Sequence, residues 1–131
     1  MNIYEENILD HYKNPRNKGI IKKPTNYHKE TNPLCGDEVE FFAIIKNKKI
    51  IDLKFNSSGC AISQASASMI AEFAKGKNIS LIKKMNKNNV LKMLNVTLTV
   101  PRIKCALLPL EVLHKTIGSE TKNLKIKKIK S

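Results

Sequence analysis

The stretch EVEFFAIIKNKKIIDLKF, residues 38–55, decides the fold because it predicts a β-hairpin. Apolar residues alternate with polar ones over 38–46 and again over 49–55, which is the period of half-buried strands. The alternating residues are Val39, Phe41, Ala43 and Ile45 in the first run and Ile51, Leu53 and Phe55 in the second. Asn47-Lys48 between the runs suits a tight turn. A weaker pattern over 26–31 predicts an edge strand beside this hairpin.

Helical periods flank the predicted sheet on both sides. Residues 3–12 place Tyr4, Ile8 and Tyr12 on one face, and Asn14-Pro15 should end that helix. A second apolar stripe consists of Ile62, Ala65, Met69 and Phe73, with Gly76 suited to the position after the helix. Further helices are predicted near 79–85, 88–94 and 101–117. Pro109 lies inside the last of these and predicts a kink or a break next to Cys105.

Composition indicates one domain with a lysine-rich surface. The 131 residues are 41% hydrophobic and carry a net charge of +13, almost all of it from lysine, since arginine occurs only at Arg16 and Arg102. Without aromatic residues among the lysines, this charge favours a solvated surface over a nucleic-acid site. No apolar run approaches the roughly 20 residues that span a bilayer, and the acidic start resembles no signal or transit peptide. We expect a single domain over 1–118, a basic disordered tail over 119–131, and a cytoplasmic location.

The three cysteines predict a shared site rather than disulfides. Cys35, Cys60 and Cys105 are odd in number, widely spaced and form no CxxC pair. Each is predicted at an element boundary, Cys60 and Cys105 near helix starts, and helix N-termini favour the thiolate that binds metal or carries sulfur. Structural cysteines more often lie inside elements, so incidental thiols in a metal-free protein are the competing interpretation.

Asp37 follows Cys35 after a single glycine, which permits both side chains to bind one metal. Gly36 gives the backbone the freedom to turn between the two ligands. Three thiolates and a carboxylate supply four ligands, enough for tetrahedral zinc or one edge of an iron–sulfur cluster. A lone oxygen among sulfurs would make the site exchangeable. Taken by itself, Asp37 would be interpreted as a turn residue.

None of the three histidines is favoured as a ligand. His114 is nine residues after Cys105, about half a turn around the helix from the thiol. His11 is one residue off the apolar face of the first helix, where we expect it to be solvated. His28 is close to the predicted site in sequence only.

The segments NPLCGDEVEF, SSGCAISQASASMI and RIKCALLPLEVL together resemble the three cysteine motifs of the U-type iron–sulfur cluster assembly family, which includes IscU, SufU and the NifU N-terminal domain. The resemblance runs from about residue 4 to 117. It implies an α+β fold, with a three-stranded antiparallel sheet and helices on one face, in agreement with the elements predicted above. It implies metal ligands at Cys35, Asp37, Cys60 and Cys105, and zinc or a [2Fe–2S] cluster as the bound group.

The family resemblance also implies partners, while the branch remains open. Members receive sulfur from a cysteine desulfurase, here of the SufS type, and apo iron–sulfur proteins are the recipients. The opening segment ILDHYKNPRNKG resembles the SufU branch. So does Lys104, directly before the last cysteine, because IscU-type members have histidine at that position. The stretch 77–100 is too short for the SufU insertion, and NVTLTVPRIK stands in place of the proline-rich chaperone-binding segment of IscU.

Two roles within the family, and one outside it, follow as hypotheses. The protein is a cluster scaffold or a zinc-dependent sulfurtransferase, and a basic zinc-stabilised nucleic-acid-binding module is the alternative. We predict that Cys35, in its glycine-hinged loop, accepts the persulfide, with Cys105 as the alternative acceptor. Cys60, clamped at a helix start, should remain a ligand. We expect neither nucleic acid nor membrane as a partner.

Overall fold

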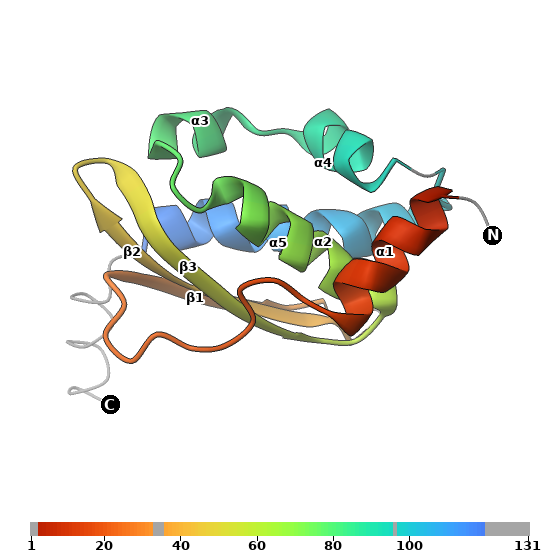
Figure 1. Cartoon of the computed structure of the whole chain (residues 1–131), viewed down its shortest axis with the longest axis horizontal. Coiled ribbons are helices and arrows are strands. Elements are labelled where there is room, and N and C mark those ends of the chain that lie inside the picture. Colours follow the sequence, from red (N-terminus) through yellow and green to blue (C-terminus); the bar gives the residue numbers. More distant parts are fainter. Residues whose placement is uncertain (1–2, 33–35, 96, 120–131) are drawn as a thin grey trace.

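The computed structural model describes residues 3–32, 36–95 and 97–119. Within these ranges it contains a three-stranded antiparallel sheet and five helices. The sheet has the order β1-β2-β3, and the helices gather on one of its faces (Figure 1). The predicted α+β architecture is therefore confirmed. The predicted tail lies outside the described residues except for Ser119.

The hairpin forms as its sequence predicts. β2 (Glu38–Lys46) and β3 (Lys49–Ser58) pair through a two-residue turn in which both Asn47 and Lys48 have positive φ, at 51° and 63°. This turn geometry matches the twist of antiparallel strands. β1 (Asn26–Thr31) pairs with β2 at the edge of the sheet, as predicted from its weaker pattern.

β3 departs from simple alternation near the turn. The register between β2 and β3 shifts at Ile44/Ile45, where Ile44 pairs with Asp52 and Ile45 pairs with Ile50. Ile51 is the extra residue of this bulge, and it points outward with 46% of its surface exposed, whereas Ile50 is fully buried. The prediction that Ile51 faces the core is thus wrong. Beyond the bulge the alternation resumes, and Leu53 and Phe55 are buried opposite Ala43 and Phe41.

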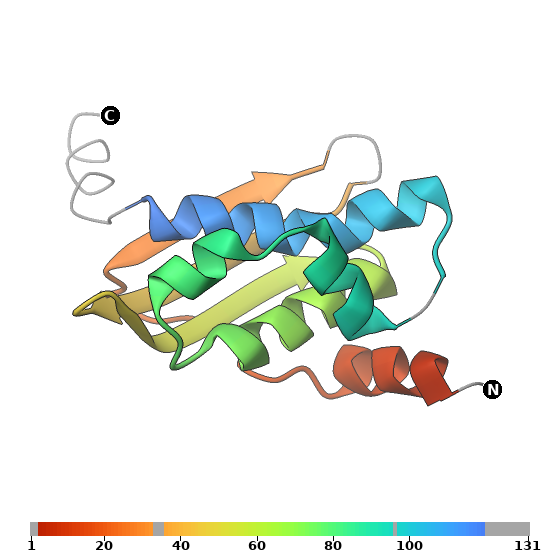
Figure 2. The ribbon, with the colours of Figure 1, turned by 90° about the horizontal axis from the view of Figure 1, so that it is seen from above.

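Two long helices cover the inner face of the sheet. α2 (Ala61–Ala74) packs on β3, and α5 (Val100–Ile117) packs on β1 and β2 and against α2 (Figures 1 and 2). Small residues on α2 permit this close approach, and the hydroxyl of Ser66 donates to the carbonyl of Ala106 at 2.6 Å across the two helices. α5 continues through Pro109 without interruption, so the predicted break does not occur.

The remaining helices form the outer part of the helical layer. α1 (Ile3–Lys13) packs against α2, while α3 (Ile79–Lys84) and α4 (Lys87–Leu94) lie over α2 and α5 (Figure 2). Side-chain caps define the two short helices, because Asn78 caps α3 and a reciprocal Asn86–Asn89 capping box begins α4. α2 ends as predicted, with Gly76 in the left-handed region at φ 87°.

The outer edge of β3 is covered at both ends by loop segments. Asn17 and Gly19 exchange backbone hydrogen bonds with Phe55, and Gly76 and Lys77 do the same with Ile50. These contacts satisfy backbone groups that would otherwise offer a template for another strand. They also fix the exit of β3, which leads directly to Gly59 and α2.

Candidate metal centre

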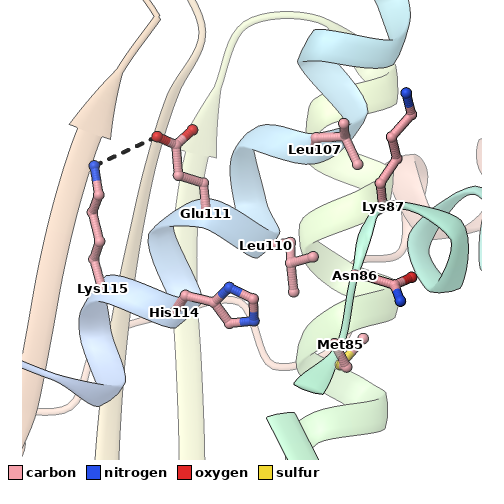
Figure 3. Close-up of a pocket in the computed structure, with 8 residues that line it drawn as sticks. All are labelled: Met85, Asn86, Lys87, Leu107, Leu110, Glu111, His114 and Lys115. Carbon is pink, nitrogen blue, oxygen red and sulfur yellow. Dashed lines mark hydrogen bonds and ion pairs between the residues drawn. The ribbon is translucent and has the colours of Figure 1, made fainter. Parts of the chain in front are cut away.

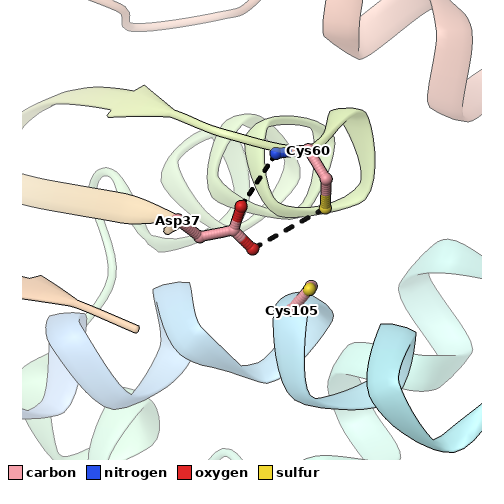
Figure 4. Close-up of side chains that lie close together, drawn as sticks. All are labelled: Asp37, Cys60 and Cys105. Carbon is pink, nitrogen blue, oxygen red and sulfur yellow. Dashed lines mark hydrogen bonds between the residues drawn. The ribbon is translucent and has the colours of Figure 1, made fainter. Parts of the chain in front are cut away.

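Three side chains from three separate segments converge at one end of the helical layer. Asp37 precedes β2, Cys60 precedes α2, and Cys105 lies in the second turn of α5. One ligand atom from each lies within 4.8 Å of the others, and the side chains point toward a common space (Figure 4). In the described part of the chain this is the group that the sequence predicts, with Cys35 falling outside the described residues.

Asp37 is held by the start of α2. Its Oδ1 accepts a hydrogen bond from the backbone N–H of Cys60 at 2.8 Å, and its Oδ2 accepts from the Cys60 thiol at 3.7 Å. The residue is fully buried. A buried carboxylate is costly unless it is hydrogen-bonded or bound to a cation, which makes Asp37 unsuited to the role of an ordinary turn residue.

Cys60 is the N-cap of α2. Its backbone is extended, with φ −73° and ψ 156°, and its Sγ accepts from the N–H of Ser63 at 3.5 Å. A cysteine at this position places its sulfur where the unpaired N–H groups and the helix dipole favour negative charge. This part of the sequence prediction is confirmed.

Cys105 is not at a helix boundary. It is the sixth residue of α5 and is buried, at 7% exposure. The N-terminal field of α5 is therefore weaker at Cys105 than the corresponding field at Cys60, because such effects fall off within the first turn. The sequence interpretation, which treated both thiols as helix-start groups, is wrong for this one.

Gly59 is a residue of the site that the sequence interpretation missed. It has φ 116°, and a Cβ built on it would lie 2.0 Å from Asp37 Oδ1 and 2.8 Å from Asp37 Cα. No side chain fits in that space without moving Asp37. In the sequence, the only signal for this role is that Gly59 directly precedes Cys60. The pairing of β2 with β3 places Gly59 against Asp37, and a single sequence does not record that contact.

The three histidines lie outside the group of ligand atoms. His114 Nε2 is 2.8 Å from the carbonyl oxygen of Ile82, which confirms that it faces away from the thiol. His28 Nε2 is 3.5 Å from Glu30 Oε1 on β1. His11 was expected to be solvated, and this is wrong: it is buried, at 6% exposure, with Nδ1 2.8 Å from Ser68 Oγ.

The burial of His11 has an electrostatic consequence. Desolvation, followed by the nearby positive charge of Arg16, holds the pKa of His11 below its usual value. Ser68 Oγ also accepts the backbone N–H of Arg16 at 2.8 Å, so one buried hydroxyl joins His11 to the loop after α1.

The donor set fits a thiophilic metal. In a tetrahedral zinc site with Zn–S near 2.3 Å and Zn–O near 2.0 Å, ligand atoms are about 3.5–3.8 Å apart. The 3.7 Å between Cys60 Sγ and Asp37 Oδ2 lies in that range. All pairs of ligand atoms are within 4.8 Å, so metal binding would require any pair to approach by about 1 Å or less. Two soft sulfurs and one oxygen suit zinc or iron rather than magnesium or calcium.

Comparison with known proteins gives the family. The family model described as the NifU-like N terminal domain matches residues 3–126. The chain therefore belongs to the NifU-like N-terminal domain family, and the recognition from its three cysteine motifs is confirmed. The match extends past residue 118 into the segment that the sequence predicts to be a tail.

Curated relatives and solved structures agree with this family. An iron–sulfur cluster assembly scaffold protein, IscU 1 of Archaeoglobus fulgidus, is 36% identical over 98% of this chain and 84% of its own length. The zinc-dependent sulfurtransferase SufU of Bacillus subtilis is 33% identical over 90% of this chain and 91% of its own. FiSufU of Fervidobacterium islandicum AW-1, a candidate assembly scaffold of the SUF system, superposes with a TM-score of 0.74 at 31% identity, covering 87% of this chain and 96% of that one.

No helix in the described ranges has the length and apolar character needed to cross a membrane.

Proposed function

We propose that this protein serves iron–sulfur cluster assembly by holding a metal at Cys35, Asp37, Cys60 and Cys105 and by accepting sulfur from a cysteine desulfurase. The observation that carries the proposal is the convergence of Asp37, Cys60 and Cys105 within 4.8 Å from three separate segments. Membership of a family whose relatives include named assembly scaffolds and a zinc-dependent sulfurtransferase supports it. Zinc and a [2Fe–2S] cluster are the two candidate occupants.

Cys35 is the proposed fourth ligand. It is two residues before Asp37, and Gly36 between them has φ 73°, a conformation that side chains disfavour. Cys35 completes the three thiolates and one carboxylate of a four-ligand site. When bound, the metal would keep these thiols deprotonated and tie three segments of the chain together.

Cys35 is also the proposed sulfur acceptor, because the other two thiols are restrained. Cys60 is fixed through its own N–H and through Ser63 at the start of α2. Cys105 is buried in an unbroken α5, so the mobility that a break at Pro109 would have given it is missing. The side chain of the neighbouring Lys104 is exposed and supplies no spare metal ligand.

The transfer step requires no added oxidant. The Cys35 thiolate attacks the terminal sulfur of the desulfurase persulfide, a new S–S bond forms on Cys35, and the S–S bond in the desulfurase breaks. The desulfurase cysteine leaves as a thiolate. A SufS-type cysteine desulfurase in the cytoplasm is the proposed donor, and apo iron–sulfur proteins are the proposed recipients of the product.

Anaerobic purification tests the metal site. Zinc content and the visible spectrum separate a colourless zinc protein from a protein that carries a cluster. Replacing Cys35, Cys60 or Cys105 singly by Ser should lower bound metal strongly in each case. Full stoichiometry and affinity in any one variant would contradict the four-ligand site.

Persulfide mapping tests the acceptor. The protein is mixed with a SufS-type desulfurase and cysteine, and the persulfide is located by peptide mass spectrometry. We expect it on Cys35, with Cys35→Ser losing sulfur acceptance. Persulfide mainly on Cys105, together with acceptance by Cys35→Ser, would assign the acceptor to Cys105 instead.

A further inference from the structure

The segment from Phe73 to Leu110 carries positive charge without any acidic residue. It contains eight Lys or Arg residues and no Asp or Glu, out of a net charge of +13 for the whole chain. This segment includes α3, α4 and the first half of α5. The positive charge is therefore concentrated in this segment rather than spread evenly along the chain.

A hollow of about 490 Å³ lies inside this positive region, between the end of α2, α3 and α4. We call it the lysine groove. Its apolar lining comes from Phe73, Leu81, Met85 and Met93, and Lys84 stands among them. Phe73 and Leu81 are 37% and 44% exposed, so the predicted core position of Phe73 is instead a surface position.

The exposed lysines of α3 and α4 form no ion pair with the acidic groups that the structure describes. Lys83, Lys84, Lys87 and Lys92 are exposed, and in the described part of the chain none of the four forms an ion pair. The ammonium group of Lys77 lies 5.3 Å from the centroid of the Phe73 ring. Exposed apolar side chains beside unpaired cations form a surface that would be stabilised by burial of its apolar area and by a partner of negative charge.

A second hollow on the other side of the Met85–Asn86 connector is different. It has a volume of about 360 Å³, and Leu107 and Leu110 of α5 line it (Figure 3). Its far wall carries Glu111, whose carboxylate pairs with Lys115 at 3.5 Å. Lys87 also lines this second hollow, but an acidic group stands in the same lining, whereas the lining of the lysine groove contains none.

We propose that the lysine groove binds an acidic amphipathic segment of a partner protein. Apolar side chains of the segment would enter the lysine groove between Phe73 and Leu81. Its carboxylates would meet Lys84 in the lining, and the exposed Lys83 and Lys87, which are close to Lys84 in the chain, would add to the attraction. A concave apolar floor suits protruding side chains better than phosphates or the flat surface of a bilayer. The groove lies about 20 Å from Cys60 along α2, at 1.5 Å per residue. The proposal does not depend on the metal site.

Fluorescence polarisation with a defined probe tests the lysine groove. The probe is a labelled 16-residue peptide of Glu and Leu, with Leu at helical i, i+3, i+4 spacing. We expect saturable binding that weakens with salt. The triple variant Lys83→Glu, Lys84→Glu, Lys87→Glu should raise Kd at least tenfold, and Leu81→Asn at least threefold.

Matched variants on the loop after α1 control for charge and polarity. Lys18, Lys22 and Lys23 are exposed there, and their triple change to Glu alters the net charge equally. Ile20, at 62% exposure, supplies the control for Leu81 as Ile20→Asn. These controls should change Kd less than twofold. Circular dichroism melts confirm that every variant is folded.

Several results would overturn the proposal. Equal losses in the two triple variants would mean nonspecific attraction to net charge. Absence of peptide binding up to about 1 mM would mean that no docking site of useful strength exists. Tighter binding of a single-stranded 20-nucleotide DNA, or of vesicles with one quarter anionic lipid, that depends on the same three lysines would assign the surface to nucleic acid or to membrane instead.

Discussion

Two glycines flank Asp37, and the space around them differs. Gly36 has φ 73°, and a Cβ built on it would meet nothing within 4 Å among the described residues. Gly59 has φ 116°, and its Cβ would lie 2.0 Å from the Asp37 carboxylate. Gly36 is thus required only by backbone conformation, whereas Gly59 is required by conformation and by space. A position can require glycine because of a positive φ or because a Cβ would have no space. Gly36 shows the first cause alone, and Gly59 shows both.

Gly59→Ala should give the largest effect. The new methyl group must displace Asp37, which breaks the hydrogen bond from the Cys60 N–H and adds strain at a positive φ. The strain alone costs about 1–3 kcal/mol, and the lost bond to a carboxylate adds about 1.5–3 kcal/mol. Zinc affinity, measured by competition with a chromophoric chelator, should fall at least a hundredfold. Wild-type affinity in this variant would refute the role given to Gly59.

Asp37→Asn should separate charge from shape. The amide oxygen can still accept from the Cys60 N–H, and the side chain still fits against Gly59. Metal affinity should fall about tenfold because a neutral ligand replaces a carboxylate, whereas urea unfolding of the metal-free protein should show less destabilisation than Gly59→Ala. An equal loss of stability in both variants would mean that the carboxylate charge, rather than the space at Gly59, controls the packing.

Gly36→Ala should cost less than either change. A non-glycine residue in the left-handed region costs about 1–2 kcal/mol, and asparagine tolerates the region better than alanine. We therefore expect Gly36→Ala to lower stability by about 1 kcal/mol and Gly36→Asn by less, with metal affinity changed only a few-fold in both. Loss of metal binding in Gly36→Asn would remove the distinction between the two glycines.

The smallest expected effect is a dependence of folding stability on pH that comes from His11, outside the metal site. Burial lowers the pKa of His11 below its unfolded value near 6.5. Stability from His11 is therefore complete above about pH 6.5 and is lost as pH falls toward the lowered pKa. His11→Gln should flatten the urea-unfolding midpoint of the metal-free protein between pH 7 and 5. An unchanged slope would show that another group causes the acid sensitivity.

Much of the fold follows from local sequence patterns. Alternation predicts β2 and β3, Asn47-Lys48 predicts their turn, and helical periods predict the five helices to within a few residues. These features depend on backbone preference and burial over short windows, which a single sequence records. The convergence of Asp37, Cys60 and Cys105 was also predictable, because the sequence has three widely spaced thiols without a CxxC pair, and its three cysteine motifs resemble those of one family.

Other features depend on neighbours that are distant in sequence. His11 is buried at a site where its Nδ1 is hydrogen-bonded to Ser68 Oγ, 57 residues away in the sequence. Phe73 fits a helical stripe, but its side chain is partly exposed near the end of α2, where it lines the lysine groove. Pro109 does not break α5, since packing against α2 and the sheet holds the helix on both sides of it. Periodicity gives no information on such contacts.

The bulge at Ile51 sets the register of β2 and β3, and so determines which residues lie opposite each other at the end of the hairpin far from the turn. Beyond it, Glu38 pairs with Ser58, and the next positions outward bring Asp37 level with Gly59. If the same residues paired without this shift, the register of Ile45–Ile50 would continue and Ser58 would stand opposite Asp37. Deleting Ile51 itself would remove the bulge and leave Asp37 level with Gly59, whereas one residue added to β3 between the bulge and Ser58 would move Gly59 away from Asp37. A change of register in this hairpin, far from any ligand, is therefore also a change at the metal centre.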